Sequence, residues 1–409
     1  MGYHTHTLPC GLRLIHHPSP SPVVYCGYGI CAGTRHEMPG EEGLAHFCEH
    51  VTFKGTMRRS ALQVLNGLER YGGDLNAFTA KEHTMYYAAI LKDHFAVAVD
   101  LLTDIVFHST YPQQELDKEI EVVCDEIASY NDSPAELIYD EFENLLFGGH
   151  PLGHNILGHA ERLRCYTTAD VSRFTQRHYR PSNAVFFVSG DVDFSRVVRL
   201  LEKATSHFPL STPCMSHESV AHSPLPAYKP FSQAVSKHTH QAHVMLGSRA
   251  FPAHDEHRMP LYLLNNMLGG PAMNARLNIA LRERRGLVYT VESSMVSYSD
   301  TGVWCLYYGC DHSDTSRCRR LVARELDKVM QKPLSTKQLD AAKRQLKGQI
   351  AVACDNRESF ALDFARSYLH HGKEKDVETL FRRIDGITPA DVQQVAQQVL
   401  GDVSMLMYE

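Results

Sequence analysis

The stretch GLAHFCEHVTF (residues 43–53) is decisive for interpreting this sequence, because it places His46 and His50 four residues apart with Glu49 directly before the second histidine. Residues four apart lie on the same face of a helix, one turn from each other. Two imidazoles in this arrangement can bind one Zn²⁺, and the carboxylate of Glu49 can then act on a water at that ion. The order is H-x-x-E-H, the reverse of the commoner H-E-x-x-H.

The motif is incomplete by itself. The chain contains 25 histidines among 409 residues, so a short pattern of this kind can also arise by chance. A zinc site needs a third protein ligand, which must come from elsewhere in the sequence. Cys48 lies inside the motif, but we expect it to be a small helix residue that faces the core and not a ligand.

A second segment, YPQQELDKEIEVVCDEIASYNDSP (111–134), has the pattern of an amphipathic helix. Its apolar residues recur at helical spacing and form one stripe: Leu116, Ile120, Val123 and Ile127. Glu119 and Glu126, seven residues apart, lie together at one margin of that stripe. A carboxylate in such a place is costly unless it is paired or bound to a metal. The pattern alone leaves open whether these two residues form ion pairs or reach a metal.

The composition restricts the class of protein. Its hydrophobic content of 43% and charged content of 22% are typical of a soluble globular chain. A net charge of −6 without a basic block argues against nucleic acid as the main partner. No apolar run reaches the length of a membrane span, and the first residues resemble neither a signal peptide nor a transit peptide. The eleven cysteines include no C-x-x-C pair and suit reduced thiols.

The apolar pattern of the first half predicts mixed helices and strands. Two strands are expected around a Ser-Pro turn in residues 12–33, and one long strand in LNAFTAKEHTMYYAAIL (75–91). Helices are expected in the following ranges: 40–55, 60–73 with Ser60 as N-cap, 92–108, 112–130 and 134–146. A further helix and strand are expected in residues 167–191.

An internal repeat predicts two domains. TTADVSRFTQRHY (167–179) is similar to TPADVQQVAQQVL (388–400), 221 residues later, and each precedes a short apolar strand. The same offset aligns VVYCGYGICAG (23–33) with VMLGSRAFPAH (244–254). We therefore predict an ancient duplication in which only the first half carries the metal helix. The expected domains are 1–212 and 236–409, joined by a polar, Pro-rich linker at 213–235.

With these segments in view, the chain resembles the insulinase/pitrilysin-type (M16) zinc metallopeptidases. It is most similar to their short two-domain branch, which includes the mitochondrial processing peptidase and bacterial homologues. The family pattern has a third ligand 76 residues after the last histidine, which is Glu126 here, and an acidic residue seven before it, Glu119. The likeness covers most of the chain and weakens from about residue 310. It implies an α+β fold of two duplicated domains, each a mainly antiparallel sheet packed with helices, and a bacterial protein. The cysteine pattern and the first residues lead us to expect a cytoplasmic location.

The resemblance implies a role for each matching residue of the metal site. His46, His50 and Glu126 would bind Zn²⁺ and leave one position open for water. Glu49 would be the general base, which then passes the proton to the leaving amine. Glu119 would orient a ligand histidine or hold the helix pair in place.

The resemblance also implies substrate-binding residues. Asn76, Ala77 and Phe78 lie where the family binds an extended substrate by strand addition. Arg282 and Tyr289 match an Arg/Tyr pair that faces the zinc, where the tyrosine would stabilise the oxyanion and the arginine would anchor the substrate. Without the family, Asn76 would be read as a turn residue, and the pair as a helix-end arginine and a core tyrosine.

The leading hypothesis is a zinc-dependent endopeptidase that cleaves peptides or unfolded segments held extended in an enclosed chamber. An alternative is a non-catalytic core subunit of the same fold, as found in respiratory complexes. A third is an enzyme that needs a separate partner chain. The complete zinc motif and the Arg/Tyr pair on one chain favour the first. Since the family encloses substrate between four such domains and this chain has two, we also expect a homodimer, with no nucleic-acid partner and no membrane insertion.

Overall fold

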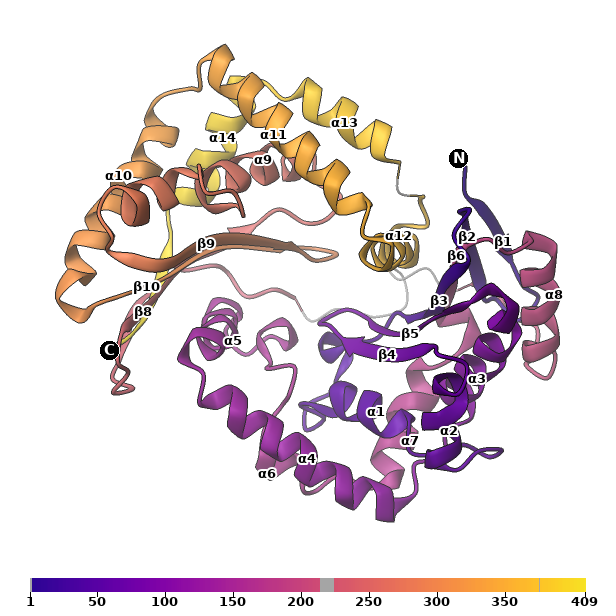
Figure 1. Cartoon of the computed structure of the whole chain (residues 1–409). Helices are drawn as coiled ribbons and strands as arrows, with labels where there is room; N and C mark the ends of the chain where they lie inside the picture. Colours follow the sequence, from indigo (N-terminus) through magenta and orange to yellow (C-terminus); the bar gives the residue numbers. More distant parts are fainter. Residues whose placement is uncertain (1, 214–223, 375) are drawn as a thin grey trace. The chain divides into compact units, whose positions relative to one another are not determined.

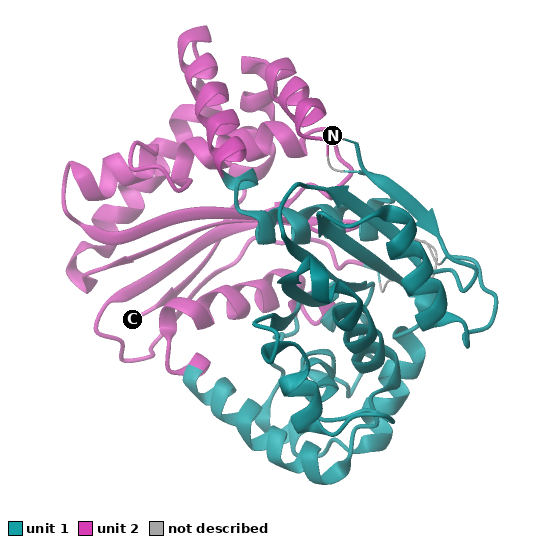
Figure 2. Ribbon diagram, turned by 45° about the vertical axis from the view of Figure 1, so that its right-hand side comes forward, with its two compact units in different colours: residues 1–129, 154–224, 353–375 teal, residues 130–153, 225–352, 376–409 magenta. Residues whose placement is uncertain are grey.

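The chain is divided into two compact units, each built around one β-sheet (Figure 2). The computed structural model describes residues 2–213, 224–374 and 376–409. The first unit consists of residues 1–129, 154–224 and 353–375, and the second of residues 130–153, 225–352 and 376–409. The central part of the predicted linker, residues 214–223, lies outside the described residues.

The first unit contains a six-stranded sheet in the order β1-β2-β6-β3-β5-β4 (Figure 1). Its strands are β1 His4–Thr7, β2 Arg13–Pro18, β3 Val23–Ile30, β4 Asp74–Thr79, β5 Thr84–Leu91 and β6 Ala184–Gly190. All neighbouring pairs are antiparallel except β2 with β6. Strand β4 is an outer strand, and within the sheet it pairs only with β5.

Helices cover both faces of this sheet. The helices of this unit are α1 Leu44–Thr52, α2 Ala61–Glu69, α3 Phe95–His108, α4 Gln113–Asn131, α6 Ala160–Leu163, α7 Thr168–His178, α8 Phe194–Thr205 and α12 Arg357–His371. Side chains alternate along each strand: Phe186 of β6 joins the large core under α1 and α3, whereas Phe187 packs with Phe364 of α12 on the other face. No helix in the described ranges is both long and apolar enough to span a lipid bilayer.

The second unit has a five-stranded sheet in the order β7-β11-β8-β10-β9. Its strands are β7 Ser232–Val235, β8 Ala242–Ala250, β9 Val288–Ser297, β10 Gly302–Cys310 and β11 Ser404–Tyr408. Its helices are α5 Pro134–Phe147, α9 Arg258–Gly269, α10 Thr315–Gln331, α11 Thr336–Cys354, α13 Val377–Gly386 and α14 Pro389–Leu400. Helix α5 packs on β8 and β11, where Phe142 is buried against Met245 and Leu406.

The two sheets have the same topology, which confirms the predicted duplication. Strands β7, β11, β8, β10 and β9 correspond in order to β2, β6, β3, β5 and β4, and the first pair of each series is parallel while the others are antiparallel. Helices α5 and α12 are exchanged between the two halves of the sequence: each follows the second long helix of one half but belongs to the compact unit whose sheet is formed mainly by the other half. The contiguous boundaries 1–212 and 236–409 stay a prediction, because the compact units cross them.

The prediction of one long strand over residues 75–91 is wrong. The segment is a hairpin in which β4 and β5 are joined by residues 80–83, closed by a bond from the Ala80 N–H to the His83 carbonyl. The sequence AKEH has none of the usual turn residues. Contacts from residues distant in sequence hold the turn instead, since the N–H groups of Thr34 and Arg35 donate to the carbonyls of Ala80 and Lys81.

Candidate metal centre

Helix α1 has one apolar face and one polar face, as the motif predicts. Its apolar residues are fully buried in the core of the first unit: Leu44, Phe47, Cys48 and Val51. His46, Glu49 and His50 lie on the opposite side at the spacing of one helical turn. Cys48 faces the core, as expected. The buried face fixes the rotation of the helix, and this rotation presents the three polar side chains together.

The start of α1 is held by the buried carboxyl group of Glu37 and by two glycines. The side chain of Glu37 accepts hydrogen bonds from the N–H groups of Gly43, at 3.2 Å, and Ala45, at 2.9 Å, and so caps the helix. Gly43 has a φ of 85° and lies against Gly158, whose Cα would be 2.7 Å from a Cβ added at Gly43. Only glycine fits this crossing, which fixes where the motif helix begins.

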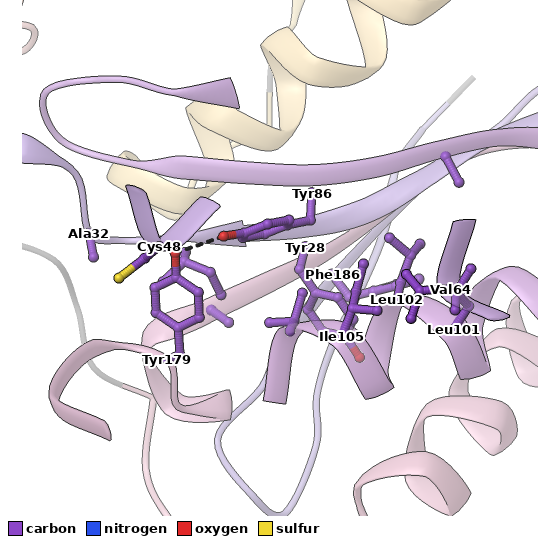
Figure 3. Packing of buried hydrophobic residues seen from close by; sticks show 14 of the residues in the cluster. Tyr28, Ala32, Cys48, Val64, Tyr86, Leu101, Leu102, Ile105, Tyr179 and Phe186 are labelled. Carbon is purple, nitrogen blue, oxygen red and sulfur yellow. Dashed lines mark hydrogen bonds between the residues drawn. The ribbon is translucent and has the colours of Figure 1, made fainter. Parts of the chain in front are cut away.

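The end of α1 is attached to the sheet through buried hydroxyl groups. Thr52 Oγ1 lies 3.3 Å from the Tyr86 hydroxyl of β5, which is 2.9 Å from the hydroxyl of Tyr179. Figure 3 shows the bond between the two tyrosines, close to Cys48. Burial raises the pKa of both tyrosines well above the usual range, so the network stays neutral. Both ends of the helix are therefore anchored.

The structure brings together the three predicted metal ligands. Among the described residues, only His46, His50 and Glu126 form a group of His, Cys, Asp or Glu whose ligand atoms all lie within 4.8 Å of one another. Glu126 Oε2 is 3.5 Å from His50 Nε2 and 4.0 Å from His46 Nε2. Two imidazole nitrogens and one carboxylate oxygen are a donor set that suits Zn²⁺ with an open position. The residues therefore fit the metal that the motif implies.

Glu119 contacts one of the three predicted ligands, His50, and also Lys54. Its Oε1 is 3.0 Å from His50 Nδ1, and its Oε2 is 2.5 Å from Lys54 Nζ. Burial acts to raise the pKa of Glu119, but the bonds to His50 and Lys54 lower it overall, so it is a carboxylate. A carboxylate at Nδ1 favours the tautomer in which His50 Nδ1 carries the proton and Nε2 is free to bind a metal.

Burial and neighbouring charges shift the pKa values of three residues at this site. Burial, with a smaller contribution from His50, lowers the pKa of His46 to about 3, so His46 is neutral. Burial also acts to lower the pKa of His50, but the bond to Glu119 and the charges of Glu49 and Glu126 raise it overall. Burial raises the pKa of Glu49, while the Thr79 hydroxyl and His50 act in the opposite direction. Glu126 is the most exposed of the ligand set, since 46% of its side chain is accessible.

The predicted substrate-binding residues of β4 share a strand but not a face. Ala77 packs against the core on the α1 side. The ring of Phe78 lies on the other side, 5.9 Å from His83 and 6.4 Å from Tyr87, and the strand period places Asn76 on that side too. What the three have in common is the main chain of an outer strand. Their role in binding stays a prediction.

Arg282 and Tyr289 belong to the second unit, where they form a pair. Arg282 lies in a π-helical turn, Asn278–Glu283 (η5), and its guanidinium carbon is 5.5 Å from the centre of the Tyr289 ring. Tyr289 is at the start of β9 and is 81% exposed. It is therefore not the core tyrosine that the residue pattern alone would favour.

Three residues of the site were missed by the sequence analysis: Glu37, Lys54 and Thr79. Lys54 had a usable signal, since it follows His50 by four residues and can turn towards the same carboxylate. Glu37 lies seven residues before the helix, too far for a capping-box pattern. Thr79 donates to Glu49 through a contact between a strand and a helix thirty residues apart, and nothing local indicates it.

Two protein-family models match most of this chain, and several curated proteins are similar to it. Residues 13–160 match the model of the insulinase family (peptidase family M16), and residues 166–346 match that of the peptidase M16 inactive domain. An uncharacterized zinc protease of Streptomyces coelicolor is 34% identical over 97% of this chain and 86% of its own length. The uncharacterized zinc protease YmxG of Bacillus subtilis is 31% identical over 96% of this chain and 95% of its own.

Solved structures share the fold. A protease from Helicobacter pylori superposes with a TM-score of 0.89 at 21% identity, covering 100% of this chain and 99% of its own. A protein of Pseudomonas fluorescens described as a peptidase M16 inactive domain has a TM-score of 0.90 at 18% identity, covering 100% and 98%. With nearly full-length relatives above 30% identity, the chain belongs to the M16 (insulinase) family of peptidases.

Proposed function

We propose that this protein is a zinc-dependent endopeptidase that cleaves peptides and unfolded segments. The observation that carries the proposal is the convergence of His46, His50 and Glu126 within 4.8 Å, with Glu49 on the same helix face as the two histidines. The names of its relatives, which are called zinc proteases, support the same class of activity.

The proposed chemistry uses one metal ion and one buried carboxylate. Bound Zn²⁺ would supply a Lewis acid that polarises the scissile carbonyl and makes water more acidic. His46, His50 and Glu126 would hold the ion, and Glu119 would keep His50 in the tautomer that binds it. Glu49 takes a proton from the attacking water as the oxygen bonds to the carbonyl carbon. It then gives that proton to the amide nitrogen as the C–N bond breaks.

We further propose that the substrate lies extended along β4. This strand has one edge that pairs with no other strand of the described sheet, so its main-chain groups at Asn76, Ala77 and Phe78 can pair with a peptide. Main-chain pairing depends little on sequence, which suits a peptidase with many substrates. A compact folded protein cannot present such a strand.

We propose that Arg282 and Tyr289 complete the site across a homodimer, so that the pair of one subunit faces the metal ligands of the other. The tyrosine hydroxyl would stabilise the developing oxyanion, and the arginine would anchor the substrate. A twofold axis would place two equivalent sites in one enclosed chamber.

Mixing inactive Glu49→Gln subunits with inactive Tyr289→Phe subunits tests whether the two subunits share a site. Activity should return in the mixture, and its absence despite demonstrated subunit exchange contradicts a shared site.

The alternative is a non-catalytic core subunit of the same fold. Nothing in the described metal centre favours it, since each residue that the mechanism needs is present. The experiment that separates the two incubates the purified protein with a mixed peptide library and reads the products by mass spectrometry. Internal cleavage that stops with a chelator and returns with zinc supports the peptidase. An intact library with a fully zinc-loaded protein supports the core subunit.

A further inference from the structure

We infer that Thr79 is a positioning residue that fixes the orientation of Glu49, an inference that rests on the proposed function. The Thr79 hydroxyl donates a hydrogen bond of 2.6 Å to Glu49 Oε2. Among the described residues this is the one hydrogen bond to the Glu49 side chain. It leaves Oε1 as the oxygen available to exchange a proton with water.

The orientation of Glu49 needs such a fixed point. Glu49 is buried, with 9% of the residue exposed, so little water is available to hold the side chain, and its own helix offers no donor to the carboxylate. The nearby tyrosine hydroxyls are occupied, since Tyr86 contacts Thr52 and Tyr179. A carboxylate without a bond could rotate about its side chain, and a general base must lie within hydrogen-bond reach of its proton.

Thr79 is itself held rigidly. It is the last residue of β4 and pairs with Thr84 of β5. The next residue, Ala80, accepts a hydrogen bond from the Thr34 N–H and donates one to His83. Positioning is most effective from a residue whose own backbone is fixed on both sides. Thr79 also belongs to the strand on which we place the substrate, so it connects substrate binding to the orientation of the base.

The test compares two substitutions in the full-length zinc-loaded protein. Thr79→Val keeps the shape and strand preference of the side chain but removes the hydroxyl, and Thr79→Ser keeps the hydroxyl. For Thr79→Val, kcat should fall about 10- to 100-fold with KM and zinc content unchanged, since this is the usual range for losing a hydrogen bond to a charged group. Thr79→Ser should restore most of the lost kcat. Crystal structures should show the Glu49 carboxylate displaced in the valine variant and in its wild-type position in the serine variant.

The control is Thr205→Val, which removes a buried hydroxyl bonded only within α8, to the Leu201 carbonyl. This control variant should leave kcat unchanged.

Should Thr79→Val fail to fold, Thr79→Ala is measured in the same way. A valine variant with wild-type kcat, or with Glu49 unmoved, overturns the inference. So does a serine variant as slow as the valine one. An inactive wild-type protein would instead contradict the proposed function, and the two crystal structures would still decide whether Thr79 holds Glu49.

Discussion

The two units share one topology, but the helix beside the outer strand carries different polar residues in each. It carries potential metal ligands in the first unit and an internally paired asparagine in the second. In the first unit α1 lies against β4, and its His46 and His50 belong, with Glu126, to a group that could hold a metal ion. In the second unit α9 lies against β9, and its buried Asn265 is satisfied internally. It donates to the Ser293 carbonyl at 3.2 Å and accepts from Trp304 Nε1 at 3.0 Å.

This difference shows how a duplicated scaffold separates function from support. In the second unit, Asn265 pairs with Ser293 and Trp304, which stabilises the fold. Among the described residues of this unit, no group of His, Cys, Asp or Glu has the geometry of a ligand set. In the first, the equivalent place holds partly unpaired donors, such as the buried His46 Nδ1, which has no hydrogen-bond partner among the described residues. The three ligands come together only in the folded chain, so the first unit should gain stability when a metal binds.

The largest effect is expected from removing a metal ligand. His50→Ala or Glu126→Ala should abolish both stoichiometric zinc and peptide cleavage, because two donors cannot hold the ion in the required geometry. Metal analysis and a peptide assay on each variant measure this. A variant that keeps both zinc and activity would mean that the ligand set is different.

The next effect concerns the exchanged helices. Phe364→Ala on α12 and Phe142→Ala on α5 should each reduce the free energy of unfolding by about 3–5 kcal/mol, since both side chains are fully buried aromatics. Only Phe364 packs on the sheet of the metal-binding unit. Zinc loss on heating should therefore shift to lower temperature in Phe364→Ala more than in Phe142→Ala. Equal shifts would show that the two units unfold together.

A smaller effect is expected from the carboxylate that contacts the ligand His50. Glu119→Gln removes the charge that His50 and Lys54 share, and should weaken zinc binding about 10- to 100-fold. Competition with a chelator of known affinity measures this. Unchanged affinity would show that Glu119 serves only to join α4 to the end of α1.

The smallest effect on zinc affinity is expected from a substitution in the second unit. Asn265→Ala leaves Trp304 Nε1 without its partner and should cost about 1–3 kcal/mol of stability, with zinc affinity unchanged. Denaturant unfolding and zinc titration of the same sample decide this. Loss of zinc affinity in this variant would contradict the separation of roles between the units.

Residues with a local signal were predicted from the sequence. The stripe on α4, the Ser60 cap and the spacing of His46 and His50 each follow from helical geometry, and the structure shows all three. The missed features depend on contacts between distant segments. The turn at residues 80–83 is held by Thr34 and Arg35. Helix α12 packs on a sheet whose strands lie far earlier in the sequence. Thr79 of β4 donates a hydrogen bond to Glu49 of α1. Local patterns carry no information about such contacts.

The most direct test of the account is Glu49→Gln. This substitution keeps the size of the side chain and all three metal ligands but removes the group that carries the proton. The variant should bind zinc with wild-type stoichiometry and lose peptide cleavage, when both are measured on the same preparation by metal analysis and by mass spectrometry of peptide products. A Glu49→Gln protein that cleaves peptides at a near-normal rate would contradict the proposed mechanism.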